Sequence, residues 1–259
     1  MTDDRAHPEA GAGGSAARLR VVVAASCHAD AEAALALAAA LARMTGAELQ
    51  GVLVRDQAVL DAATHPGARL LGYGGRPVPR MSGAAMLRAF EADARRFERD
   101  LARLSQPAPA DAVRILTGRL PDAMRTAAAA GDFAVLGFRH LRYHGRQDAA
   151  RAGADLVLAL GAGIDPPAFA ADLARALGRH LIVLAAAGEE ARVAAWFDAR
   201  PGPRPDIRAY RGAQGLVAAL DRLGPEGVVL ATEERDPRVL DRLVEAARCP
   251  VILRVPAAG

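Results

Sequence analysis

The chain has 259 residues, 52% of them hydrophobic, which is enough for one large domain or two ordinary ones with a buried core. All 33 basic residues are arginines, so chemistry that needs a lysine, such as a Walker-type phosphate loop or a Schiff base, is excluded. A formal net charge of +3 and an aromatic content of 4% argue against binding to nucleic acid.

Three features predict a cytoplasmic protein without a membrane segment. Cys27 and Cys249 are too few and too far apart for a disulfide framework or a zinc site, so we expect no metal. Residues 1–17 are acidic and glycine-rich, which predicts a disordered tail rather than a secretory signal. The longest apolar run, residues 33–42, is far shorter than the ~20 residues that span a bilayer.

Strand and helix patterns alternate from residue 18 onward. In the first half, strands are predicted at 19–26, 47–56, 112–118 and 132–138, and helices at 30–46, 87–104 and 121–131. Gly46 is placed to end the first helix. Residues 57–84 are rich in glycine and proline, which predicts a long loop with a helical turn at its start.

The second half repeats this alternation. Strands are predicted at 155–163, 180–187, 206–212, 227–234 and 250–255, and helices at 166–178, 189–200, 214–224 and 237–248. Single helices between strands imply right-handed crossovers, so we expect an α/β fold with mainly parallel, doubly wound (Rossmann-like) sheets and helices on both faces. The organisation predicted is two tandem domains, 18–150 and 151–259.

The strand at 155–163 leaves two assignments open. It is taken as the first strand of the second domain, because a helix and a strand follow it in the order that domain requires. In the alternative, it closes the first domain and the second domain is truncated.

The order of these segments resembles the universal stress protein family in a tandem two-domain form. The sequence segments that carry the resemblance are VVVAAS at 21–26, DFAVLGFR at 132–139 and CPVILRV at 249–255, together with the strand that ends at Gly118. The resemblance implies a homodimer and a site for ATP or another adenine nucleotide. In that family an acid follows the first strand, and a glycine-rich phosphate loop follows the fourth.

The sequence departs from the family pattern at those two places. Ser26 stands where the acid is expected, Cys27 where a glycine is usual, and Gly161 takes the acid's place in the second domain. After the fourth strand, Gly137 is kept but His140 replaces the second glycine, and in the second domain Ala231 replaces the first one. The nucleotide site is therefore predicted to be degenerate in the first domain and absent from the second.

The candidate pocket lies at the strand ends of the first domain. Its predicted lining is Ser26, Cys27, Val54, Gly118, Gly137, Arg139, His140 and Arg142. Two interpretations remain for Arg139, His140 and Arg142. They form either a substitute site for a small anionic ligand or a solvated or subunit-facing loop. Ser26, Cys27 and His28 either cap the following helix, contact a ligand or act as a nucleophile and base.

These observations predict a non-catalytic regulatory or binding protein with at most a degenerate nucleotide or anion pocket in the first domain. A nucleotide-binding enzyme, an ATP hydrolase or transferase, is the first alternative. A ligand-free dimeric scaffold is the second.

Overall fold

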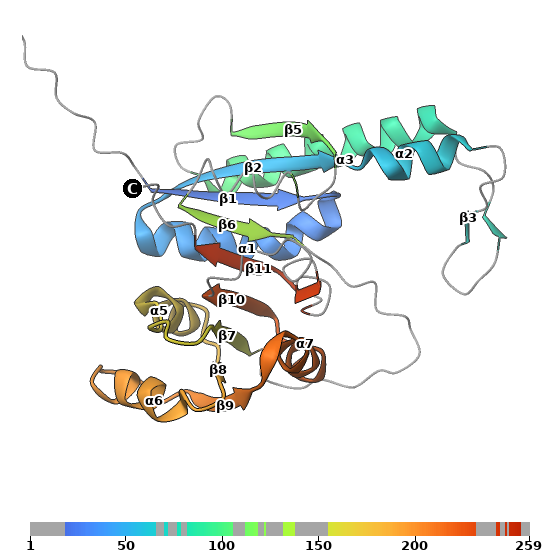
Figure 1. Ribbon diagram of the computed structural model, residues 1–259. Coiled ribbons are helices and arrows are strands. Elements are labelled where there is room, and N and C mark those ends of the chain that lie inside the picture. The colour runs from blue at the N-terminus through green and yellow to red at the C-terminus, as the bar shows by residue number, and fades with distance from the viewer. Residues whose placement is uncertain are drawn as a thin grey trace, which may run out of the picture.

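The computed structural model (Figure 1) contains one nine-stranded sheet covered by helices, and a separate pair of short strands. It describes residues 19–65, 70–71, 77–78, 82–105, 112–118, 122, 132–137, 155–231, 242–243, 247 and 249–254. The predicted tail at 1–17 and the predicted helices at 121–131 and 237–248 lie wholly or mostly outside these residues.

The first half of the chain supplies four strands of the large sheet. Its elements are β1 (Arg20–Ala25), α1 (His28–Thr45), β2 (Glu48–Arg55), α2 (Gln57–Thr64), β3 (Leu70–Leu71), β4 (Pro77–Val78), α3 (Gly83–Leu104), β5 (Val113–Thr117) and β6 (Phe133–Leu136). Helix α1 ends as predicted at Gly46, whose left-handed φ of 66° lets its N–H donate to the Ala42 carbonyl.

The second half supplies the other five strands. Its elements are β7 (Leu156–Leu160), α5 (Ala168–Ala176), β8 (Leu181–Ala186), α6 (Glu190–Asp198), β9 (Asp206–Tyr210), α7 (Gly212–Leu223), β10 (Gly227–Ala231) and β11 (Val251–Arg254). β7 is buried along its whole length and β8 along all but its last residue, as expected of central strands of a parallel sheet that is covered on both faces.

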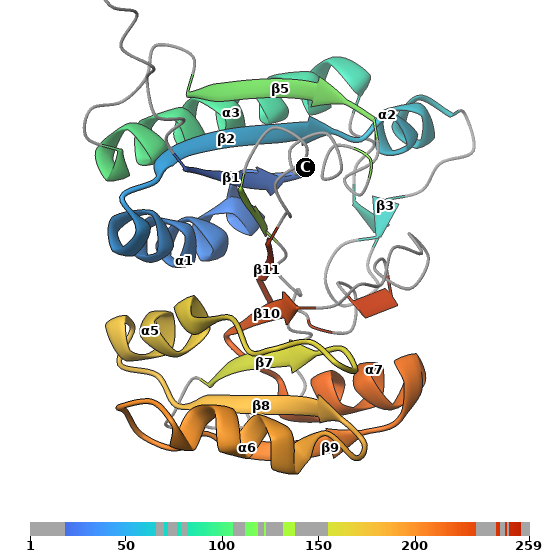
Figure 2. The same ribbon diagram turned by 60° about the vertical axis from the view of Figure 1, so that its left-hand side comes forward.

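The strand order across the sheet is β5-β2-β1-β6-β11-β10-β7-β8-β9. All neighbours are parallel except β6 and β11, which run antiparallel with Leu136 opposite Val251. Figure 2 shows β11 between the strands of the two halves. Counted within each half, the order is 3-2-1-4 for the first and 3-2-1-4-5 for the second, so the chain is an α/β protein with a doubly wound, mainly parallel sheet.

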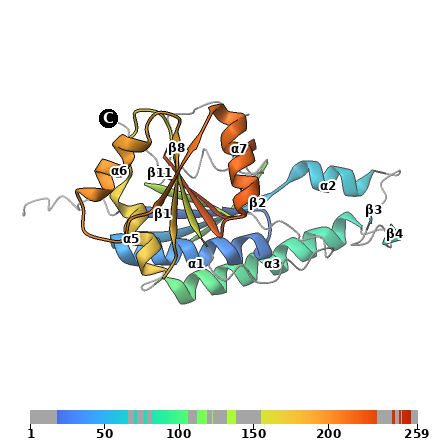
Figure 3. The same ribbon diagram turned by 90° about the horizontal axis from the view of Figure 1, so that it is seen from below.

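Helices cover both faces of this sheet. Alternate residues of β1 belong to different cores: Val21 and Val23 pack with α1, α3, α5 and α6, whereas Val22 packs in the core that includes α7. Figure 3 shows α7 and α6 on opposite sides of β8. The prediction of helices on both faces is therefore confirmed.

Strand β7 pairs with β8 on one side and with β10 on the other, in the middle of the second half. This is the position of the first strand in the 3-2-1-4-5 order. The strands expected for two domains form one continuous sheet, because β11 completes the second half and also supplies the neighbour of β6.

The predicted loop at 57–84 is wrong in part. Residues 57–64 form α2, a helix of 8 residues, and two short strands, β3 and β4, pair antiparallel beyond it. The glycines and prolines that suggested a loop all lie after residue 65, so they interrupt regular structure only beyond α2 and do not break this helix.

Candidate functional site

The carboxyl ends of β1 and β6 meet at the point in the first half where the strand order reverses. Strand β1 lies between β2 and β6, and the chain leaves β1 towards β2. Ligands of open α/β sheets bind in the crevice at such a switch point. We call residues 26–30 together with Gly137 the first corner.

The serine at this corner does not cap α1, so the capping interpretation of Ser26 is wrong. The N-cap residue is Cys27, which has extended backbone angles and no capping hydrogen bond from its side chain. The Ser26 hydroxyl instead donates to the Asp30 carboxylate at 2.8 Å. Helix α1 begins at His28, so Ser26 is one residue too early to reach its first free N–H groups.

Helix α3 supplies the cap that the local sequence does not. The His28 N–H donates to an Asp93 carboxylate oxygen at 3.2 Å, and the His28 Nε2 hydrogen-bonds with Asp100 at 2.8 Å. Asp93 and Asp100 are seven residues apart, so both lie on the face of α3 that packs against α1. Carboxylates from α3 thus occupy the N-terminal end of α1, where an anion would otherwise be favoured.

The thiol of Cys27 is poorly suited to nucleophilic chemistry. Its pKa is raised to about 11, chiefly by partial burial and also by the Asp30 carboxylate, against a lowering by backbone N–H groups. Reactive cysteines have a lowered pKa, because the thiolate is the nucleophile. Among the described residues, no hydrogen bond joins the Cys27 thiol to the His28 ring, so the two residues do not form a nucleophile and base in contact.

The other predicted pocket residues have different surroundings. Val54 is fully buried in the core shared with α7, so its side chain packs there and does not line an open pocket. Gly118 follows β5, and its N–H donates to the Arg55 carbonyl at 3.0 Å. Arg139, His140 and Arg142 lie outside the described residues.

Gly137 has a packing role that sequence reasoning missed. It is buried, and a Cβ atom built on it would lie 2.6 Å from the Asp30 carbonyl oxygen and 3.0 Å from the Cβ of Ala25. The missing side chain therefore allows the end of β6 to lie directly against the first turn of α1. The structure brings Gly137 together with Ser26 and Cys27 at one corner, as the alignment of strand ends predicts.

The equivalent corner of the second half comprises residues 161–165 and Ala231. The Gly161 N–H donates to the Ala231 carbonyl at 2.9 Å, which ties the end of β7 to the end of β10. The hydroxyl of Tyr210, on β9, donates to the Leu160 carbonyl at 2.8 Å. Backbone and side-chain hydrogen bonds thus join three strand ends at this second corner.

Arg192 on α6 holds the loop after β7. Its guanidinium donates to Glu189 at 2.6 Å, to Asp165 at 2.5 Å and to the Ile164 carbonyl at 2.8 Å. The hydrogen bond from Arg192 lowers the pKa of Glu189. The sequence offered no signal for this contact, because Asp165 is 27 residues from Arg192.

A cavity of about 660 Å³ lies at the opposite edge of the sheet, near the starts of β8 and β9. Four arginines, His180 and Trp196 are among its lining residues. Sequence reasoning missed this cavity, since its walls come from α5, α6 and two turns, and the only local signal is the four-residue spacing of Trp196 and Arg200 on one helical face.

Within the described part of the chain, no group of three or more histidine, cysteine or acidic side chains could hold a metal ion. None of the helices described is both long enough and apolar enough to cross a membrane.

The strand order and the two corners define a doubly wound α/β protein with one switch point in each half. No protein-family model matches the chain, and no curated protein matches it. Among solved structures, the chain is similar to a universal stress protein from Archaeoglobus fulgidus DSM 4304. The sequence identity is 9% and the TM-score is 0.41, over 91% of this chain and 95% of the other.

Proposed function

We propose that the protein is a non-catalytic regulatory or binding protein of the universal-stress type, built from tandem domains at 18–150 and 151–259. The strand order supports this organisation, because each half has its own 3-2-1-4 arrangement and its own switch point. The sequence segments at 21–26, 132–139 and 249–255 resemble segments of that family, which supports the same interpretation.

The observation that carries the proposal is the occupation of the first corner by carboxylates. Asp93 accepts from the first N–H of α1, Asp100 binds the His28 ring, and Asp30 accepts from Ser26. A triphosphate approaching this helix end would find the first N–H of α1 already bound to a carboxylate, where a phosphate site offers a free donor. Arg96 and Arg103 pair with Asp93 and Asp100, so these acids are held in place on α3. The corner thus supports at most a degenerate nucleotide pocket, which agrees with the loss of the family's acid and second glycine.

The chemistry of the corner supports a non-catalytic role. The raised pKa keeps the Cys27 thiol protonated at neutral pH, and among the described residues no hydrogen bond joins this thiol to the His28 ring. A hydrolase or transferase would need an activated nucleophile or a base that can reach one.

A titration with Mg-ATP tests the proposal. A ligand at about 100 times its Kd stabilises a protein by about 2.7 kcal/mol, so millimolar ATP would visibly raise the melting temperature if it bound with micromolar affinity. We expect no such rise and no release of phosphate. Turnover would establish the enzyme alternative, and binding without turnover that is lost on Arg139→Ala with Arg142→Ala would establish a working anion pocket.

We also propose a homodimer, as the resemblance implies, and a cytoplasmic location. Within the described residues, β6 and β11 pair with each other inside one chain, so neither is an open sheet edge. The outer strands of the sheet are β5 and β9. A second subunit would therefore meet an outer strand or a helical face. Native mass spectrometry measures the number of subunits, and a purely monomeric species would refute the dimer.

A further inference from the structure

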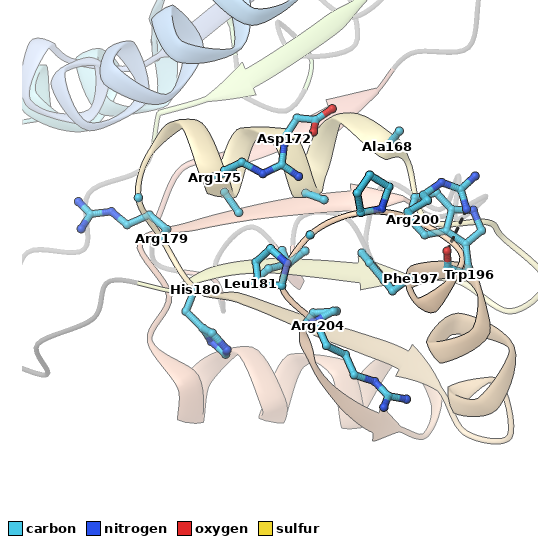
Figure 4. Close-up of a pocket in the computed structure, with 17 residues that line it drawn as sticks. Ala168, Asp172, Arg175, Arg179, His180, Leu181, Trp196, Phe197, Arg200 and Arg204 are labelled. Atoms are coloured by element: carbon cyan, nitrogen blue, oxygen red, sulfur yellow. Dashed lines mark hydrogen bonds and ion pairs between the residues drawn. The ribbon is translucent and has the colours of Figure 1, made fainter.

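The cavity near the starts of β8 and β9 has the dimensions of a small-molecule site. Its volume of about 660 Å³ lies within the range of roughly 300–1,000 Å³ that is typical of ligand pockets. It is formed by α5, α6, the turn at 178–181 and the segment at 200–205, and Figure 4 shows these elements around it. It lies at the other end of the strands from both corners, so it is separate from the nucleotide site considered above.

The base of this cavity is apolar. Ala174, Leu181 and Phe197 line it and are almost completely buried, so their contacts with the core fix their positions. Pro201, Pro203 and Pro205 restrict the backbone of the adjoining wall. The pocket therefore has a preformed apolar surface, which reduces the ordering cost of binding a ligand with a flat or apolar body.

Cationic side chains surround this apolar base, and most of them are engaged by acids. Arg175 contacts Asp172 at 2.9 Å, and Arg204 contacts Asp198 at 3.3 Å. Arg179 pairs with Glu226 at 2.6 Å, and Figure 4 shows its side chain pointing away from the rest of the pocket.

Arg200 differs from these arginines. Among the described residues, no acidic group forms an ion pair with it. The guanidinium carbon lies 3.5 Å from the centroid of the Trp196 ring, and one nitrogen donates to the Trp196 carbonyl at 2.9 Å. These contacts orient the guanidinium at the edge of the pocket and leave most of its five N–H donors for another partner.

We propose that this pocket binds a small aromatic anion, with the ring on the apolar base and a carboxylate or phosphate group on Arg200. The charge of the ligand matches the guanidinium that no described acid neutralises, and an Arg fork suits both acid groups. The aromatic body matches the apolar surface of Phe197 and Leu181, and stacking on Trp196 holds the guanidinium beside it. Two sources of the acid group, a carboxylic acid and a phosphate monoester, share this chemistry.

The intrinsic fluorescence of the protein provides a direct measurement, because Trp196 is its one tryptophan. The probes are phenyl phosphate, benzoate, inorganic phosphate and phenol, each titrated to about ten times a Kd of 1 mM and checked by calorimetry. Phenyl phosphate, benzoate or both should change the fluorescence saturably, and their relative affinity identifies the acid group. Inorganic phosphate should bind at least about fivefold more weakly than the better aromatic anion, and phenol should not bind at all.

A pair of arginine variants tests the assignment to Arg200. Arg200→Gln should weaken binding of the better probe by about tenfold or more, measured by calorimetry because the substitution itself alters the environment of Trp196. Arg222→Gln is the matched control, since Arg222 is an exposed helical arginine that also donates to the carbonyl four residues before it. The control should bind like the wild type, and thermal melting confirms that both variants are folded.

Three results would overturn the proposal. Saturable binding by none of the four probes would show that the pocket takes no such ligand. If phenol bound as tightly as the better aromatic anion, the acid group would not be recognised. If inorganic phosphate bound as tightly, the aromatic ring would not be recognised. Unchanged affinity in Arg200→Gln would place the binding elsewhere. None of these outcomes depends on whether the first corner binds ATP.

Discussion

A single methyl group at Gly137 provides the sharpest test of the first corner. The sequence suggests that this glycine is the remnant of a phosphate loop, whereas the structure assigns it a packing role between β6 and α1. A Cβ atom there would lie 2.6 Å from the carbonyl oxygen of Asp30 and 2.8 Å from its carbonyl carbon. Both are backbone atoms, so no flexible side chain can move aside.

The expected cost follows from this geometry. To reach ordinary van der Waals contact at 3.4 Å, the strand and the helix must separate by about 0.8 Å, in a region where α1 is also held by Asp93. Overpacking of this kind costs about 1–3 kcal/mol, and a backbone clash belongs at the upper end. For a chain of this length, about 2–3 kcal/mol lowers the melting temperature by about 4–12 °C.

The assay is urea denaturation and thermal melting of Gly137→Ala beside Gly215→Ala. Gly215 lies inside α7, and a Cβ atom there would meet nothing within 4 Å. Alanine is the better helix former, so the control should be more stable than the wild type by about 0.5–1 kcal/mol. If Gly137→Ala unfolds at the same urea concentration as the wild type, the glycine is not required for packing and the close approach of β6 to α1 is refuted.

Three further predictions concern the surroundings of this corner. The pKa of Cys27 is raised to about 11, chiefly by partial burial, so its alkylation rate should climb steadily to about pH 10 without a plateau. Peptide mass spectrometry follows the rate, and a plateau near neutral pH would contradict this. Asp100→Asn should lower the free energy of unfolding by about 1 kcal/mol through its weakened contact with His28, and equal stability in urea would argue against that contact. Gly51→Ala, whose new Cβ would lie 2.7 Å from the Phe97 ring, should destabilise by about 1–3 kcal/mol, and Phe97→Leu should reduce this effect in a double-mutant cycle.

The element pattern of the fold could be predicted because it is local. Apolar runs such as 21–25 form buried strands, and the amphipathic stripe that includes Phe97 and Leu101 forms α3. The pairing of β6 with β11 could not be predicted, since Leu136 and Val251 come from opposite halves of the chain. Nothing in either short apolar segment specifies its direction relative to the other.

In the candidate site, too, the local features could be predicted and the long-range contacts could not. The position of Ser26, Cys27 and Gly137 at one corner follows from where strands end, so sequence alone locates it. Their contacts do not follow, because Asp93 and Asp100 lie 65 and 72 residues from His28, on a helix whose polar face reads as an ordinary solvated surface. A cap supplied by another helix leaves no signal next to the helix that it caps.

These contacts also give a physical reason for a serine, rather than an acid, at position 26. The Ser26 oxygen lies 2.8 Å from an Asp30 carboxylate oxygen, and its hydroxyl is a donor. An aspartate at position 26 would place a second carboxylate within a few ångströms of Asp30, and two carboxylates that share a site cannot both ionise without cost. The carboxylates of this corner come from α1 and α3, and Asp93 rather than Ser26 accepts from the first N–H of α1. A serine at the strand end therefore fits the corner because it adds a donor and no further charge.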